Sequence, residues 1–198
     1  GLFQRVLGTI LAKQPKNMSR MRHIMIAALA TLAGAISCAN EDKKLTIADQ
    51  EAAIDSYISQ NYANNTVVRR NGSNRVILDT TSVNIQDSLV YGDSLYFYYA
   101  GYVFTRSPST LFSTNNQTVA EESGFTLSDP DYSVRKILFT KGCLVNGLEN
   151  GMYGVKDGGH CIILFSAQYG FYDSYVYNIP KLSALAYEIW VDRVIKKD

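Results

Sequence analysis

The sequence predicts an α+β fold with a largely antiparallel β-sheet, one short helix among the strands, and a further helix before the sheet. Two observations lead to this prediction. Apolar and aromatic runs typical of strands recur through the second half of the 198-residue chain, and only one glycine-rich helical segment interrupts them. The strands therefore lack the regular alternation with helices that characterises parallel sheets.

Residues 1–37 indicate an N-terminal extension followed by a secretory signal. A basic segment precedes the apolar run from Ile24 to Ile36, which is too short to span a bilayer and fits the core of a signal peptide. The next residues, Ala-Ile-Ser-Cys, resemble a bacterial lipobox, which implies that Cys38 carries a lipid. The acidic residues after it resemble the export signal of Bacteroidetes lipoproteins. An ordinary cleavage site beside a chance cysteine is the alternative.

Residues 38–89 are expected to contain a polar tether, a helix and a hairpin. Ile47, Ile54 and Ile58 recur at helical spacing within 46–64, and Thr46 is expected to cap this helix. Asn71–Gly72 separates two short β runs, which is a strong hairpin signal.

Residues 90–198 are expected to form the main domain. The predicted strands are 93–104, 133–140, 160–166 and 184–195. Gly101 inside the first strand predicts a bulge or a close backbone approach. The polar stretch 109–131 predicts a loop or flap, and 147–155 a short helix. In the last strand, alternation places one set of residues on a common face: Leu185, Tyr187, Ile189 and Val191.

Composition and motifs exclude several kinds of chemistry. A net charge of +1 argues against a nucleic-acid binder. The glycines at 147–159 lack the spacing of a phosphate-binding loop. No metal or other cofactor is expected, because His160 is the one histidine outside the signal and Cys161 beside it would point to the opposite strand face. Cys143 and Cys161 could pair or remain buried thiols.

The segments "VNGLENGMYGVKDGGHCIILFSAQYG" and "NIPKLSALAYEI" resemble the FKBP-type peptidyl-prolyl isomerases, and the weaker resemblance spans roughly residues 90–195. It implies a sheet curved around the short helix and a dry aromatic pocket. The resemblance implies catalytic roles for Tyr99, Phe112, Val145, Leu148, Tyr169, Ile179 and Tyr187, and substrate-binding roles for Leu144 and Ser113. The Val145 N–H and the Tyr169 hydroxyl would be the hydrogen-bonding groups.

Two positions depart from the family pattern. Ser113 replaces the family's flap aspartate, and Leu148 replaces the tryptophan of the pocket floor. The resemblance therefore implies an envelope lipoprotein, anchored to the membrane through an N-terminal lipid, that binds proline-containing segments of exported proteins with weak isomerase activity. The alternative is a catalytically inactive FKBP-like surface lipoprotein that acts as a protein- or glycan-interaction module.

Overall fold

The computed structural model describes residues 40–79, 88–126 and 130–197. The chain divides into two units, 1–44 and 45–198, and the second unit contains the whole sheet. The expected signal and Cys38 lie outside the described residues. No helix among the described residues is both long enough and apolar enough to cross a membrane.

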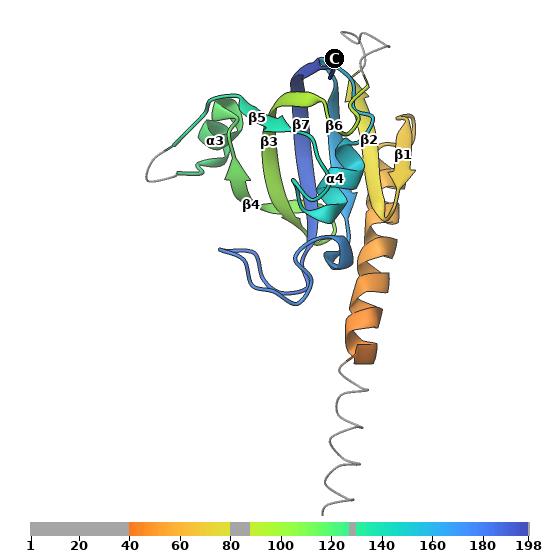
Figure 1. The fold of residues 1–198 in the computed structure, drawn as a ribbon. Helices are drawn as coiled ribbons and strands as arrows, with labels where there is room; N and C mark the ends of the chain where they lie inside the picture. Colours follow the sequence, from red (N-terminus) through yellow and green to blue (C-terminus); the bar gives the residue numbers. More distant parts are fainter. Residues whose placement is uncertain (1–39, 80–87, 127–129, 198) are drawn as a thin grey trace, which may run out of the picture. The chain divides into compact units, whose positions relative to one another are not determined.

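A seven-stranded antiparallel sheet organises the second unit (Figure 1). Its order is β1–β2–β6–β7–β3–β4, and β5 pairs with the same edge of β3 as β4 does, further toward the start of β3. The strands are β1 Val67–Arg70, β2 Ser73–Asp79, β3 Ser94–Phe104, β4 Pro108–Thr114, β5 Arg135–Leu138, β6 His160–Phe165 and β7 Ala184–Ile195. The predicted α+β fold with an antiparallel sheet is therefore confirmed.

The N-terminal helix and the short helix among the strands are both present as predicted, but their ends differ from the predicted ones. The N-terminal helix covers residues 40–61, so Thr46 lies inside it and the expected cap there is wrong. The short helix α4 covers Asn146–Met152. The hairpin between β1 and β2 turns at Asn71–Gly72 as predicted, and both residues have positive φ, which this tight turn requires.

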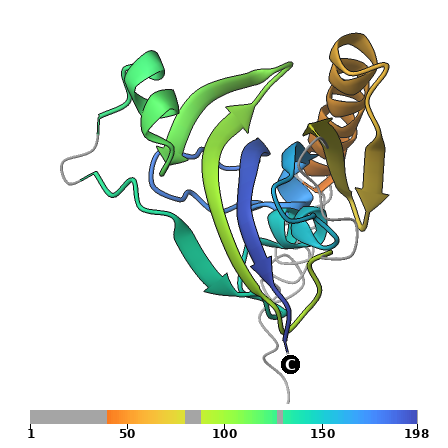
Figure 2. The same ribbon diagram turned by 90° about the horizontal axis from the view of Figure 1, so that it is seen from above.

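Alternation along the strands gives the sheet two buried faces. The inner face packs against α4 around a large core that includes Phe97, Ile163, Phe165, Leu185 and Ile189. The outer face packs against residues 45–61 of the N-terminal helix, through a second core of smaller side chains. That second core contains Ile54, Ile58, Val76, Phe104, Ile162, Leu164, Ala184 and Ala186. Figure 2 shows the curvature of β3, β4 and β7.

The stretch 109–131 is more regular than a loop or flap, which corrects the sequence prediction. Its first part continues β4, and residues Gln117–Ser123 form the helix α3. The Asn116 side chain caps α3 by accepting a hydrogen bond from the Val119 N–H at 3.3 Å, and Gly124 ends it in the left-handed conformation. A seven-residue helix of mixed polarity is too short for periodicity to reveal.

Asp93 fastens the C-terminal residues to the start of β3. Its carboxylate is buried and accepts hydrogen bonds from Lys196 Nζ at 2.6 Å and from the Val90 and Lys197 N–H groups. Burial raises the pKa of Asp93, but these hydrogen bonds and the Lys196 charge outweigh it and hold the pKa below its usual value. The ionised carboxylate is therefore part of the fold.

Candidate functional site

A cavity of about 980 Å³ opens between the inner face of the sheet, the segment before α4 and the loop before β7. Aromatic and aliphatic side chains predominate in its wall. The lining residues are Phe97, Tyr99, Phe112, Ser113, Phe125, Thr126, Arg135, Cys143, Leu144, Val145, Leu148, Phe171, Val176, Tyr177, Asn178, Ile179 and Tyr187. Its size and apolar character match those of pockets that bind small molecules or peptide side chains.

Gly101 makes room for the aromatic wall of the cavity. Gly101 pairs with Ser113 and Tyr102 pairs with Leu111, so Phe112 is an extra residue in β4 and forms a bulge. A Cβ atom on Gly101 would lie 2.7 Å from two Phe112 ring carbons and 3.0 Å from Tyr187 Cε1. The bulge and the close approach predicted for Gly101 are both present.

Tyr187 lies at the centre of an aromatic cluster. Its ring meets Phe112 edge to face, with centroids 5.7 Å apart, and stacks on Phe165 at 6.0 Å. Tyr187 is only 7% exposed. Burial, with a smaller contribution from Tyr99, raises the pKa of Tyr187 far above its usual range, so the phenol stays neutral.

The Tyr99 hydroxyl forms the polar edge of the cavity with Ser113, whose Oγ lies 2.9 Å away. Asn115 fixes this part of β3 from the side. Its Oδ1 accepts a hydrogen bond from the Tyr99 N–H at 2.7 Å, while its Nδ2 donates to the carbonyls of Phe97 and Ser133. Asn115 thus fills the short stretch of the β3 edge that neither β4 nor β5 covers.

Helix α4 lies unusually close to β6, because glycines face the strand. A Cβ atom on Gly147 would lie within 2.6 Å of three Phe165 ring carbons, and one on Gly151 would overlap Ile163 and approach Ser73 Oγ. This proximity places Leu148, which is 5% exposed, against both the core and the cavity. Gly147 and Gly151 therefore serve packing, whereas Gly154 and Gly158 have positive φ in the turns that follow the helix.

Two polar side chains hold α4 at its ends. Glu149 is buried and accepts hydrogen bonds from the Gly142 N–H at 2.7 Å and the Tyr91 hydroxyl at 3.0 Å, which fixes the segment before the helix. Arg75 donates to the carbonyls of Gly151 and Tyr153 at 2.7 and 2.8 Å. Its positive charge suits the negative end of the helix dipole.

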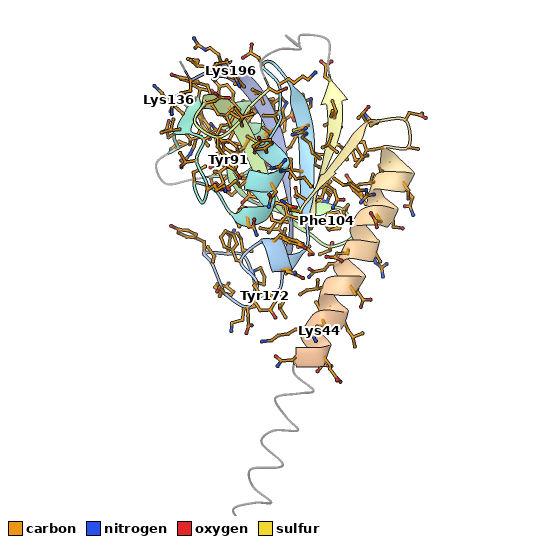
Figure 3. The ribbon with its side chains drawn as sticks, turned by 45° about the vertical axis from the view of Figure 1, so that its right-hand side comes forward. Lys44, Tyr91, Phe104, Lys136, Tyr172 and Lys196 are labelled. Carbon is orange, nitrogen blue, oxygen red and sulfur yellow. The ribbon has the colours of Figure 1, made fainter. Side chains whose placement is uncertain are left out.

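The loop between Tyr169 and β7 forms the opposite rim. A tight turn closes it at the tip, where the Ile179 N–H donates to the Val176 carbonyl at 2.8 Å. Tyr177 at this tip is 93% exposed. Gln50 of the N-terminal helix holds both ends of the loop, because it accepts from the Ala167 N–H and donates to the Leu182 carbonyl. Figure 3 shows Tyr172 among the side chains of this loop.

The structure brings together eight of the nine side chains assigned to the pocket from the sequence. They are Tyr99, Phe112, Ser113, Leu144, Val145, Leu148, Ile179 and Tyr187. Tyr169 lies elsewhere: its ring packs over Gly72 in the β1–β2 turn, where a glycine Cβ would overlap it. Tyr169 instead lines a small polar hollow at this turn.

Sequence reasoning missed several lining residues. Phe97 precedes Tyr99 by two positions and so shares its strand face, which period-two alternation could have revealed. Phe171 and Tyr177 belong to an irregular loop, and no periodic signal fixes their direction. Arg135 introduces a positive charge into the wall of the cavity.

The two described cysteines are free thiols. Cys143 lines the cavity, whereas Cys161 belongs to β6 and is buried in the inner core, where burial raises the pKa of its thiol to about 12. Within residues 40–79, 88–126 and 130–197, no three His, Cys, Asp or Glu side chains gather in a way that could hold a metal ion.

The antiparallel sheet that packs against α4 is an FKBP-like fold, and comparison with solved structures supports this. FkpA from Escherichia coli aligns with 98% of this chain and 82% of its own, at 16% identity and a TM-score of 0.52. A structure of the three FKBP domains of wheat FKBP73 aligns with 67% of this chain and half of its own length, at 12% identity and a TM-score of 0.52.

Comparisons of sequence alone give nothing similar. No protein-family model matches the chain, and no curated protein matches it. At 12–16% identity, the solved structures establish the fold only.

Proposed function

We propose that the protein binds proline-containing segments of exported proteins in the aromatic cavity and slowly accelerates the rotation of their Xaa–Pro bonds. The observation that supports this is the convergence of eight expected pocket residues, from five separate segments of the chain, on one cavity. A proline ring would sit over Leu148 and against the wall that the Phe112 and Tyr187 rings form.

The arrangement suits a reaction that needs no nucleophile. The barrier to amide rotation is roughly 18–20 kcal/mol, because the planar amide is stabilised by resonance. A dry aromatic wall favours the twisted and less dipolar amide over the planar one, which is preferential binding of the transition state. The Val145 N–H has no hydrogen-bond partner in the described part of the chain, so it is free to hold the substrate carbonyl.

Weak activity follows from the two departures from the family pattern. Ser113 gives Tyr99 a neutral hydrogen-bond partner in place of a carboxylate. Leu148 supplies a smaller floor than an indole would. The same two residues favour the second candidate, a module that binds proline segments without isomerising them.

An isomerisation assay with the full chain separates these possibilities. Exchange between cis and trans forms of a short proline peptide is followed by NMR, with and without protein, for the parent chain and for Phe112→Ala. Tyr98→Ala is the matched control, because it removes a neighbouring aromatic ring on the opposite face of β3.

Acceleration that disappears in Phe112→Ala and persists in Tyr98→Ala supports the enzyme. Peptide binding without acceleration makes the protein an interaction module. Absence of binding contradicts both functions.

We further propose that Cys38 carries a lipid that holds the protein at the cell envelope. The lipobox-like sequence before Cys38 supports this. Cys38→Ser should release the protein from the membrane fraction and change the mass of its N-terminal peptide. Membrane association unchanged in Cys38→Ser would contradict the proposal.

A further inference from the structure

A second hollow lies on the outer face of the sheet, beside α3. Its volume is about 600 Å³. Strands β3 and β7 contribute Tyr102, Glu188 and Trp190, while α3 and the residue before it contribute Asn116, Thr118, Val119, Glu122 and Ser123. Tyr102 and Glu188 alternate with Gly101 and Tyr187, which face the cavity, so the two sites lie on opposite faces. We call this hollow the outer groove.

Aromatic rings follow one row across three strands beside the outer groove. Tyr98 of β3 pairs with Trp190 of β7, and Trp190 pairs with His160 of β6. The His160 ring stacks on Trp190, with centroids 5.1 Å apart and planes 17° apart. Trp190 is the only tryptophan of the chain and remains half-buried, so its indole can still contact a ligand.

The outer groove is negatively charged. Glu122 and Glu188 line it, and no lysine or arginine does. His160 Nε2 lies 2.8 Å from Glu188 Oε1, whereas Glu122 forms no ion pair within the described residues. Burial raises the pKa of Tyr102, and the nearby Glu188 charge raises it further.

A tyrosine ring on the neighbouring part of the same sheet face already has cations stacked over it. Tyr96 has two cations over its ring, Arg193 at 5.0 Å and Lys136 at 5.2 Å. Among the described residues, neither Trp190 nor Tyr102 has such a cation. The outer groove thus has the rings and the carboxylates of a cation site without a cation of its own.

We propose that the outer groove binds an arginine side chain of an extended peptide segment from another protein. A guanidinium stacks on tryptophan and tyrosine faces and pairs with carboxylates in a planar geometry, which an ammonium does not match. Uncharged hydroxyl-rich ligands such as oligosaccharides fit the rings but leave the Glu122 carboxylate without a counter-charge.

The single tryptophan gives a direct assay on the full chain. Trp190 fluorescence is titrated with an acetylated and amidated Gly-Gly-Arg-Gly-Gly peptide at low salt. The peptide lacks proline, so it does not address the cavity. We expect a saturable change in fluorescence that weakens at 1 M salt, where the screening length is about 3 Å. The same peptide with neutral citrulline in place of arginine should give no such change.

Carboxylate variants test the charge contribution. Glu122→Gln should lower the affinity for the arginine peptide roughly two- to five-fold, as expected for the loss of an exposed ion pair. Glu122 is exposed on α3, so this variant retains the fold. Glu121→Gln is the matched control, because the Glu121 carboxylate accepts a hydrogen bond from Gln117 and does not line the groove. It should leave the affinity unchanged.

Four results would overturn the proposal. The first is the absence of a saturable fluorescence change with the arginine peptide, and the second is equal binding of the citrulline peptide. The third is an equal loss of affinity for the arginine peptide in Glu121→Gln and Glu122→Gln. The fourth is a saturable response to a neutral oligosaccharide without one to the arginine peptide, which would assign the groove to carbohydrates.

Discussion

Replacing Gly147 with alanine should destabilise the protein, although alanine is ordinarily the better helix residue. Gly→Ala inside a helix favours the folded state by up to about 1 kcal/mol. At Gly147, however, the new methyl group would lie within 2.6 Å of three Phe165 ring carbons, where about 3.5–4.0 Å is the preferred separation. The ring must move, or α4 must withdraw from β6.

Neither adjustment is easy. Phe165 is fully buried and stacked on Tyr187, and α4 is held by Glu149 at one end and Arg75 at the other. Overpacking of this kind costs about 1–3 kcal/mol. We therefore expect a net loss of about 1–2 kcal/mol. For a chain of this size, that corresponds to a fall in Tm of about 2–8 °C.

Urea unfolding of the full chain measures this loss, and a double-mutant cycle identifies its cause. Phe165→Leu removes the ring carbons, so combining it with Gly147→Ala should cost less than the sum of the two changes, with a coupling of about 0.5–3 kcal/mol. Asn146→Ala, exposed on the same helix, is the control and should change stability by less than about 0.5 kcal/mol. A Gly147→Ala variant as stable as the parent would refute the packing argument.

Three further predictions concern polar contacts. Asn115→Ala leaves β3 backbone groups unpaired and should lower the urea-unfolding free energy by about 1–3 kcal/mol; an unchanged value contradicts this. Asp93 has a lowered pKa, so it stabilises above about pH 4 and this contribution is lost as the pH falls through that pKa. Asp93→Asn should therefore lower the free energy of unfolding at pH 7 and lower it less at pH 3. An equal loss at both pH values would exclude a stabilising contribution from the ionised carboxylate. Gln50→Ala should speed chymotrypsin cleavage of the Tyr-rich rim loop, and equal cleavage in the exposed control Gln60→Ala would argue against its role.

The sheet could be predicted from the sequence because its strands carry strong periodic signals. Leu185, Tyr187, Ile189 and Val191 alternate with outward residues and all belong to the inner core. Gly101 was informative for a related reason, since glycine within an aromatic strand has few explanations besides a bulge or close contact. The start of the N-terminal helix was missed, because its first residues are polar and carry no apolar period.

The cavity could be predicted only where its residues lie on regular elements or beside them. Tyr99, Phe112 and Tyr187 belong to strands, so their faces follow from the register. Tyr169 belongs to a single turn of 3-10 helix, where a small rotation decides whether the ring faces the cavity or the β1–β2 turn. Its contact with Gly72 joins positions nearly a hundred residues apart, which local sequence does not encode.

Strand β3 carries four of the 14 tyrosines of the chain and contributes to both sites. Successive residues of β3 face opposite sides, so Phe97, Tyr99 and Gly101 build the cavity, while Tyr98 and Tyr102 face the outer side with Trp190. The two sites share this strand but no side chain. Phe112→Ala should therefore leave arginine-peptide binding intact, and Glu122→Gln should leave proline-peptide binding intact. Loss of both functions in either variant would mean that the strand itself had been disturbed.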